Sequence, residues 1–160
     1  MSIREEPAKQ APNLRVANFD EVNEGFTIDQ ALSEARRCLQ CRKPACTKGC
    51  PVGVPISRFL GALREGEIEK ALAIIKEKNS LPGVCGRVCP QENQCEGLCV
   101  LGKKGQPIAI GLLERFVADH ADPHNAMPVK AASTGTKVAV VGSGPAGLTA
   151  AAGLALLGYE

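Results

Sequence analysis

Cysteines are the residues of this sequence that could do the most chemistry. All eight lie in the middle of the chain, in two blocks of four. The first block has the form Cys-x2-Cys-x4-Cys-x3-Cys-Pro, and the second has the form Cys-x3-Cys-Pro-x4-Cys-x3-Cys. Each block offers four thiols on a short stretch of chain that Gly and Pro allow to bend. The positions are Cys38, Cys41, Cys46 and Cys50 in the first block, and Cys85, Cys89, Cys95 and Cys99 in the second.

Three kinds of chemistry could use these thiols. Disulfides are compatible with the even count, but the N-terminal segment shows no apolar signal-peptide core, and cytosolic thiols stay reduced. Structural zinc sites usually combine two Cys-x2-Cys pairs, and only Cys38 and Cys41 have that spacing. Iron–sulfur clusters are held by a compact run of thiolates plus a distant one, and Cys-Pro often closes the run. Cys50-Pro51 and Cys89-Pro90 fit that pattern, so we favour two iron–sulfur clusters.

A glycine-rich loop near the end of the sequence is the second motif with a chemical meaning. An apolar run precedes G-x-G-x-x-G and an Ala-rich stretch follows it, which is the context that a dinucleotide-binding loop requires. The first glycine permits a tight turn, the second lets the backbone approach a pyrophosphate, and the third lets helix and strand pack closely. Ala151 and Gly158 resemble the FAD form of the motif. The predicted cofactor-binding residues are Gly142, Ser143, Gly144, Pro145, Ala146 and Gly147.

The dinucleotide unit is expected to be incomplete. Its ribose-binding acid belongs about 20 residues further on, at the end of a second strand. The sequence given ends at Glu160, where that second strand should begin. One strand and one helix cannot form a sheet. We therefore expect an N-terminal fragment of a longer flavoprotein, with FAD and NADPH bound by the full-length parent only.

The elements that position these motifs are predicted to be helices. A Thr27–Gln30 capping box followed by apolar residues at helical spacing predicts a helix from about residue 28 into Cys38. A short apolar face around Phe59 predicts a second helix, which Gly66 ends. Further helices are predicted over 67–79, 107–120 and 145–157, loops over 38–55 and 80–107, and a strand over 137–141.

The expected fold class is mainly α. It is a small helical bundle wrapped around two iron–sulfur clusters, followed by one truncated βα unit of a Rossmann-like FAD domain. The expected segments are an N-terminal arm (1–26), a helical two-[4Fe–4S] domain (27–122), a linker (123–136) and the truncated start of a FAD/NAD(P)-binding domain (137–160).

Composition narrows the class of protein further. The chain has 19 Lys and Arg against 17 Asp and Glu, so its net charge of +2 gives no case for wholesale nucleic-acid or anionic-membrane binding. No apolar run is long enough to predict a membrane span, and we expect a cytoplasmic protein. Aromatic residues are scarce, with four Phe, one Tyr and no Trp. A small core of this kind needs staples, and metal clusters would provide them.

Several sequence runs carry a resemblance to a known family. Together with the glycine loop, they resemble the small (β) subunit of NADPH-dependent glutamate synthase. A similar module occurs in the large subunit of electron-bifurcating NADH-dependent ferredoxin:NADP oxidoreductase and in dihydropyrimidine dehydrogenase. The runs are Arg37-Cys-Leu-Gln-Cys41, Cys46-x3-Cys-Pro-Val52, Leu81-Pro-Gly-Val-Cys-Gly-Arg-Val-Cys-Pro-Gln91, Cys95-Glu-Gly-Leu-Cys99 and Ile110-Gly-Leu-Leu-Glu-Arg115.

The resemblance implies an all-α domain that relays electrons between an FAD, reduced by NADPH in the complete protein, and a partner through two [4Fe–4S] clusters. It implies no catalytic residue within this chain. Counting thiols alone would instead assign four cysteines to each cluster, so that Cys85 is the alternative to Glu114 as a ligand. The implied ligands are Cys38, Cys41, Cys46 and Cys99 for one cluster, and Cys50, Cys89, Cys95 and Glu114 for the other.

The function expected is that of an electron-transfer module in an NAD(P)H-dependent flavin and iron–sulfur oxidoreductase. The leading parent is a glutamate synthase small subunit, and the alternative parent is the electron-bifurcating oxidoreductase. The expected partner is the glutamate synthase large subunit or another flavin and iron–sulfur electron-transfer subunit. An alternative of another class is a metal-stapled interaction module without a redox role, which docks a partner through the helices around Phe59, Ile68 and Ile75.

Overall fold

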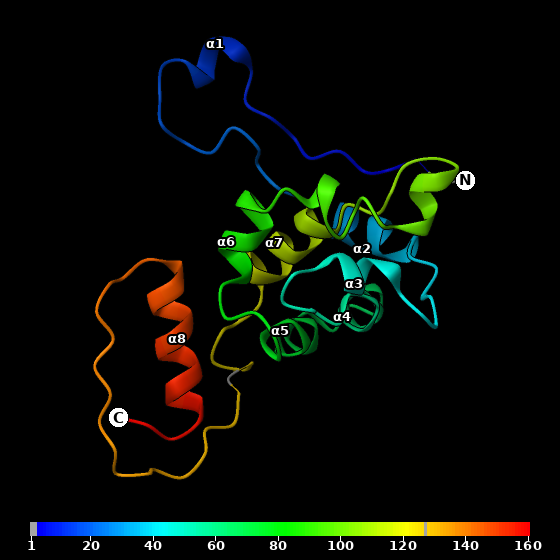
Figure 1. Ribbon diagram of the computed structural model, residues 1–160. Coiled ribbons are helices and arrows are strands. Elements are labelled where there is room, and N and C mark those ends of the chain that lie inside the picture. Colours follow the sequence, from blue (N-terminus) through cyan, green and yellow to red (C-terminus); the bar gives the residue numbers. More distant parts are fainter. Residues whose placement is uncertain (1–2, 127) are drawn as a thin grey trace.

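The computed structural model describes residues 3–126 and 128–160, which are mainly helical (Figure 1). Met1, Ser2 and Met127, which belong to the predicted arm and linker, lie outside the described residues. No described helix has both the length and the apolar character needed to cross a membrane. The helices are α1 (Pro12–Arg15), α2 (Ile28–Arg36), α3 (Ala45–Gly49), α4 (Ile56–Arg64), α5 (Ile68–Lys76), α6 (Pro82–Val88), α7 (Ile110–His120) and α8 (Pro145–Leu156), with short 3-10 helices η1 (Gln91–Asn93) and η2 (Val100–Lys103).

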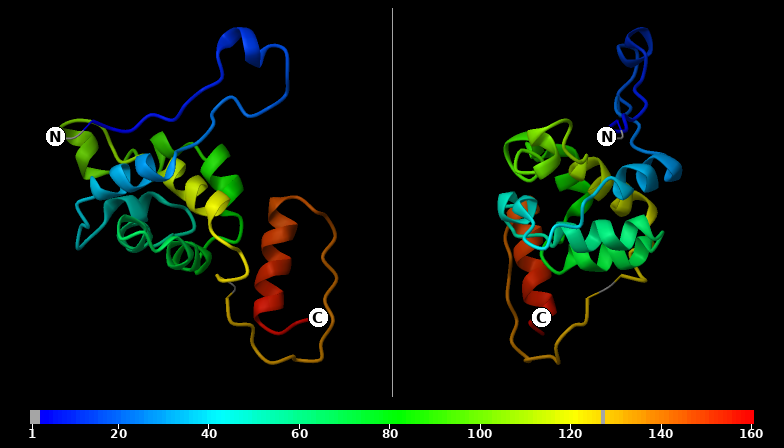
Figure 2. Two further views of the ribbon diagram at one scale, coloured as in Figure 1. Left: turned by 180° about the vertical axis from the view of Figure 1, so that it is seen from behind. Right: turned by 90° about the vertical axis from the view of Figure 1, so that its right-hand side faces the viewer.

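The core lies where α2, α4, α5 and α7 pack against one another (Figure 2). Phe59 and Leu63 of α4, Ile75 of α5 and Leu113 of α7 are all completely buried. They belong to the apolar stripes that predicted these helices, and each buried side chain of this size contributes about 1.5–3 kcal/mol. Gly66, in a left-handed conformation with φ +82°, ends α4 and lets α5 return along it. The helical part of the predicted fold is thus confirmed.

The start of α2 confirms the predicted capping box. The backbone N–H of Gln30 donates to Thr27 Oγ1 at 3.3 Å, and the backbone N–H of Thr27 donates to Gln30 Oε1 at 3.0 Å. Two of the N–H groups left free at the helix start are thereby satisfied. The helix ends at Arg36, so Cys38 lies just beyond its last turn.

Two helices lie within segments predicted to be cysteine loops. Helix α3 occupies part of 38–55, and α6 occupies the start of 80–107. Helix α6 begins with Pro82, which suits a first turn, and it packs along α7. The loop prediction was wrong here because tertiary packing against α7 overrides the weak helix propensity of a Gly-, Pro- and Cys-rich segment.

The N-terminal arm is more ordered than the sequence predicted. It carries the short helix α1 and one antiparallel bridge between Lys9 and Asn23, and it ends at the buried Phe26. Arg115 of α7 anchors it by donating to the Asn23 carbonyl at 2.8 Å and to Glu21 Oε2 at 2.6 Å. Specific hydrogen bonds therefore hold a segment in which the sequence shows no apolar periodicity.

The C-terminal segment confirms a helix but not the predicted strand. Helix α8 lies beside α5 and α6 and has no buried residue, while 137–141 is not a strand. The Glu160 N–H donates to the Thr136 carbonyl at 3.0 Å, and the Val138 N–H donates to the Glu160 carbonyl at 2.7 Å. This is the bonding pattern of one parallel pair, centred on Lys137 and Glu160. A single pair is too short for a strand, so the strand predicted at 137–141 is not found.

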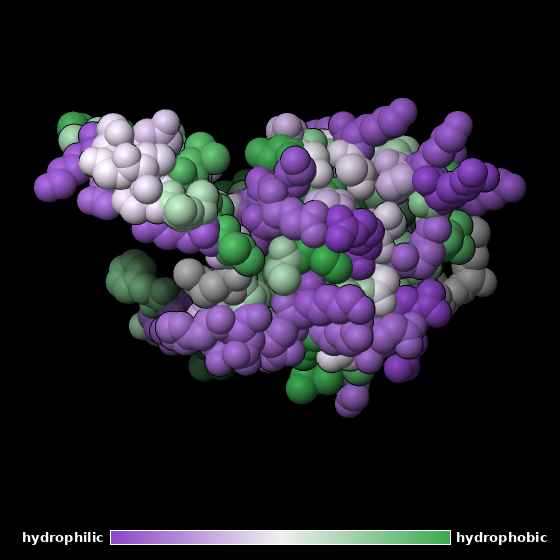
Figure 3. Space-filling view, turned by 90° about the horizontal axis from the view of Figure 1, so that it is seen from below, coloured by the Kyte–Doolittle hydropathy of each residue, from purple (hydrophilic) through white to green (hydrophobic). Residues whose placement is uncertain are grey.

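The surface is mostly hydrophilic, as expected when the apolar side chains of the helices pack inside. Seen from below, hydrophilic side chains cover much of the molecule, and hydrophobic residues show between them (Figure 3). Several apolar side chains of the C-terminal segment remain exposed, among them Val141, Leu148 and Leu157. This segment therefore contributes little to the helical core.

The close contact of α6 and α7 gives a first prediction, on Gly86. A Cβ at this position would lie 2.7 Å from the Arg115 backbone nitrogen, which is shorter than real contacts allow. We expect Gly86→Ala to force the two helices apart and to lower the free energy of unfolding by about 1–3 kcal/mol, measured by anaerobic urea denaturation.

Gly83 of the same helix provides the matched control. A Cβ there would meet its nearest neighbour, Ala118 Cβ, at an ordinary 3.6 Å. Because Ala favours a helix over Gly by about 1 kcal/mol, Gly83→Ala should leave the stability equal or higher. Equal losses of stability in the two variants would contradict the close packing of α6 on α7.

Candidate metal centres

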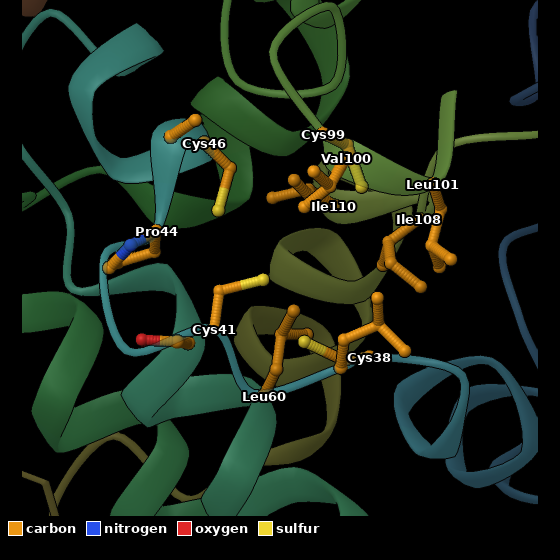
Figure 4. Close-up of a pocket in the computed structure, with 13 residues that line it drawn as sticks. Cys38, Cys41, Pro44, Cys46, Leu60, Cys99, Val100, Leu101, Ile108 and Ile110 are labelled. Carbon is orange, nitrogen blue, oxygen red and sulfur yellow. The ribbon is translucent and has the colours of Figure 1, made fainter. Parts of the chain in front are cut away.

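Four thiols from both cysteine blocks line one pocket. Cys38 and Cys41 come from the segment between α2 and α3, Cys46 comes from the first turn of α3, and Cys99 is the residue before η2. All four sulfur atoms point into the space between them (Figure 4). The other lining residues are almost all apolar: Leu39, Pro44, Ala45, Ser57, Leu60, Val100, Leu101, Ile108 and Ile110.

A buried carboxylate holds the two sides of this pocket together. Glu34, completely buried in α2, accepts from the Ala109 N–H at 2.8 Å and from Arg37 Nη1 at 2.7 Å. Arg37 in turn donates to the Gln106 carbonyl at 2.9 Å. The segment that carries Cys38 is thereby fixed to the segment that follows η2. Sequence reasoning missed Glu34, because a Glu inside a helix is usually solvated.

A backbone turn brings the first two thiols to the same side. Gln40, between Cys38 and Cys41, has φ +50° and is the one non-glycine residue in the described part of the chain with a left-handed conformation. Such a conformation costs on the order of 1 kcal/mol for a residue with a Cβ. The turn it makes shortens the segment between the two thiols, so both reach the pocket.

Two thiols of the first set have raised pKa values. Burial, together with the neighbouring thiols, raises the pKa of Cys46 from 9.0 to about 11. Burial also raises the pKa of Cys38, with Cys41 and Cys99 adding to the effect. Four thiolates in one apolar pocket would repel one another, so they need positive charge between them. Iron cations supply that charge, and this donor set therefore fits a cubane cluster held by four cysteines.

A second group of thiols, together with the Glu114 carboxylate, lies at the ends of α3 and α6 and on α7. Burial, followed by the charge of the adjacent Glu96, raises the pKa of Cys95 to about 12, and Cys50 and Glu114 contribute in the same direction. Burial also raises the pKa of Cys89 to about 11, with Cys85, Glu114 and Cys50 contributing. The predicted second ligands, and Cys85 with them, therefore lie near enough to influence one another's charge.

Asn79 contacts both Glu114 and Cys85, the two candidates for the fourth ligand of the second cluster. Asn79 Nδ2 donates to Glu114 Oε1 at 2.7 Å, and Cys85 Sγ donates to Asn79 Oδ1 at 3.7 Å. Burial raises the pKa of Glu114 to about 7, and the hydrogen bond from Asn79 offsets part of this rise. The Glu114 carboxylate is therefore turned inward and fixed through one oxygen. Sequence reasoning missed Asn79, since only the fold brings residues 79 and 114 together.

Disulfides and sites for a single metal ion fit the described residues less well than a cluster does. All eight cysteines are free thiols. Among residues 3–126 and 128–160, no three His, Cys, Asp or Glu side chains lie close enough together to bind a single metal ion. The first four thiols instead surround a space, and a cluster with an iron at each corner needs ligands placed around it in this way.

The glycine loop lies apart from the thiols, before α8. Gly142 has φ +112°, and a Cβ on Gly147 would collide with the Gly142 carbonyl oxygen. Glycine is therefore required at both positions. Gly144 precedes the first residue of α8 and has open space around it. Ser143, Pro145 and Ala146 complete a turn that leads into the helix start, which is where a phosphate would bind.

Comparison with known proteins gives this arrangement a family. A sequence model described as dihydropyrimidine dehydrogenase domain II, 4Fe–4S cluster, matches residues 15–126. The glutamate synthase [NADPH] small chain of Escherichia coli K12 is 41% identical over 150 residues, which are 92% of this chain and 32% of the relative. The protein of the same name from Azospirillum brasilense is 36% identical over 157 residues, 96% of this chain and 33% of the relative.

A third relative is named for a different enzyme. The NAD-dependent dihydropyrimidine dehydrogenase subunit PreT of E. coli K12 is 38% identical over 144 residues, 89% of this chain and 35% of the relative. The chain thus spans about a third of the length of the curated relatives it matches. The predicted resemblance to glutamate synthase small chains is confirmed. The range 15–126 contains both cysteine blocks and all helices from α2 to α7, and the chain belongs to the family of dihydropyrimidine dehydrogenase domain II, 4Fe–4S cluster.

Proposed function

We propose that residues 27–122 are the electron-transfer module of an NAD(P)H-dependent flavin and iron–sulfur oxidoreductase, and that they hold two [4Fe–4S] clusters. The observation that carries the proposal is the apolar pocket lined by four thiols, within a range that matches a 4Fe–4S cluster family. When bound, such clusters supply one-electron transfer at potentials that the surrounding protein sets.

The residues of the chain have distinct tasks at the first centre. The thiolates of Cys38, Cys41, Cys46 and Cys99 hold the iron. The apolar walls, including Leu60 and Ile108, exclude water and lower the local dielectric, which is one of the means by which a protein tunes a cluster. Glu34 keeps the two ligand-bearing segments at a fixed separation through its hydrogen bonds.

The ligands proposed for the second centre are Cys50, Cys89, Cys95 and Glu114. Glu114 is supported by its burial and by the hydrogen bond from Asn79, which leaves its second oxygen free for iron. A carboxylate is a harder ligand than a thiolate, so it makes one iron unlike the other three. Cys85 remains the rival ligand, and its contact with Asn79 keeps it next to the site.

The parent that we propose is the small subunit of an NADPH-dependent glutamate synthase, with the large subunit as partner. Residues 1–26 would be an arm, 123–136 a linker, and 137–160 the start of a Rossmann-like domain that binds FAD and, in the full-length protein, works with NADPH. The glycines around Gly142 and the parallel pair of Lys137 and Glu160 support that start. Reduced thiols suit the cytoplasm, to which we assign the protein. The similarity to the PreT subunit favours an NAD-dependent dihydropyrimidine dehydrogenase subunit as the second candidate.

Iron content tests the proposal directly. The full chain, loaded anaerobically with iron and sulfide, should bind about eight iron atoms and absorb visible light that bleaches on reduction. Cys99→Ser should lose about half of this iron, because Cys99 shares the pocket of the first block although it belongs to the second. Stoichiometric zinc without iron would contradict the proposal.

A pair of variants distinguishes the last ligand of the second centre. Glu114→Ala should remove iron from one cluster or change its EPR signal, because it deletes a ligand. Cys85→Ala should retain both clusters, because the thiol donates to Asn79 beside the centre. The reverse outcome, with iron lost only in Cys85→Ala, would show that four thiolates hold the second cluster.

The raised thiol pKa values predict a pH dependence of loading. In the metal-free protein, thiols such as Cys46 and Cys95, with pKa values near 11 and 12, are protonated at neutral pH. Iron binds thiolate, so each bond releases a proton and uptake must become more favourable as the pH rises. We expect faster anaerobic loading at about pH 8.5 than at about pH 7. Free cysteine serves as the control for the reagents, and loading with the same pH response as free cysteine would contradict the role of burial.

A further inference from the structure

We propose that the surface around the first thiol pocket is the docking site for an acidic electron-transfer protein or domain. This inference rests on the proposed function, because it names the kind of partner that the first centre serves. It starts from the distribution of charge around the pocket.

The two segments that form the pocket contain only positive charge. Residues 35–57 and 97–113 include no Asp or Glu and seven Lys or Arg. The whole chain has a net charge of +2, so these seven leave −5 for all other residues. Six of the seven side chains are exposed, and none of the six forms an ion pair with a side chain that the structure describes. These six, which we call the basic face, are Arg36, Arg42, Lys43, Lys48, Lys103 and Lys104.

Every cation of the basic face lies within five residues of a pocket thiol in the sequence, and Lys104 also borders the pocket in space. Leu39 and Leu101 line the pocket and also line a neighbouring hollow that includes Lys104. Arg42 and Lys43 follow Cys41 directly in the sequence, and both are exposed. A partner that covered these cations would therefore also cover the surface nearest to the first centre. Electron tunnelling falls steeply with distance, so this is where a redox partner has to approach.

Exposed apolar side chains also belong to this surface. Leu39 is 63% exposed and Val100 is 42% exposed, and both line the pocket. An apolar centre with a charged rim is the arrangement of transient protein–protein interfaces. The rim steers an oppositely charged partner into place, and the apolar centre gives close contact after docking.

Nucleic acids and lipid surfaces match this face less well. Residues 35–57 and 97–113 contain no aromatic side chain on which a base could stack. The cations lie on loops, on the short helices α3 and η2 and at the end of α2, whereas a membrane surface binds along one face of a long amphipathic helix. An acidic protein satisfies both the charge of the rim and the apolar centre.

Two haem proteins of opposite charge test the proposal. The full chain, loaded with its clusters and reduced by dithionite, is mixed anaerobically with acidic cytochrome b5 or basic cytochrome c, and haem reduction is followed by stopped flow. Cytochrome b5 should react faster at low ionic strength and lose this advantage as salt screens the charges. The double variant Lys103→Glu/Lys104→Glu should slow cytochrome b5 by about tenfold at low salt and accelerate cytochrome c.

The matched control reverses two cations that lie far from the thiols, on the arm: Lys9→Glu/Arg15→Glu. These side chains are also exposed, and the change in net charge is the same. The control should keep the rates of the unsubstituted chain for both haem proteins. An equal effect in the two double variants, or none in either, would overturn the docking proposal, as would tighter binding of a DNA duplex or phosphatidylserine vesicles than of cytochrome b5. Iron analysis precedes each run, so a chain that binds no iron refutes the proposed function and not the docking site alone.

Discussion

The buried carboxylate of Glu34 is the constraint on which the first centre depends. It accepts from the Glu5 N–H at 3.0 Å, from Arg37 at 2.7 Å and from the Ala109 N–H at 2.8 Å. These donors come from the arm, from the segment before Cys38 and from the segment before α7. A buried carboxylate needs such partners, so these hydrogen bonds tie the three segments to one another. The pocket that receives thiols from both cysteine blocks is a consequence of this packing.

At the proposed second centre, small residues hold the chain segments close together, as the hydrogen bonds of Glu34 do at the first. Gly86 lets α6 lie directly against α7, and Gly111 leaves room for the Gln91 side chain at the start of α7. Glu96, next to Cys95, accepts from the Gly111 N–H at 3.1 Å. The cysteine segment and α7 are thus joined at several points, which brings Glu114 into the same region as the thiols. Without these close approaches, a side chain on α7 could not reach a cluster held by the loops.

The two proposed centres differ in their electrostatic surroundings. The exposed charges next to the first pocket are cations, and its buried Glu34 is paired with Arg37, whereas Glu96 and Glu114 lie near the thiols of the second group. Nearby positive charge favours the reduced, more negative form of a cluster, and nearby negative charge disfavours it. The chain therefore combines a centre facing a basic surface with a centre in a more acidic interior. This difference suits a module that passes electrons in one direction.

Much of the fold was predictable from the sequence, because local forces decide it. Apolar periodicity and the Thr27–Gln30 capping box predicted the helices that became α2, α4, α5, α7 and α8, and the spacing of the cysteines with Cys-Pro indicated iron–sulfur chemistry. Tertiary structure decided the rest. Helix α6 exists because α7 supports it, the strand at 137–141 is absent because one parallel pair is too short a ladder, and Asn79 meets Glu114 across 35 residues of sequence. Sequence spacing sets which thiols are neighbours along the chain. Only long-range packing, held by Glu34 and Gly86, determines which of them face the same space.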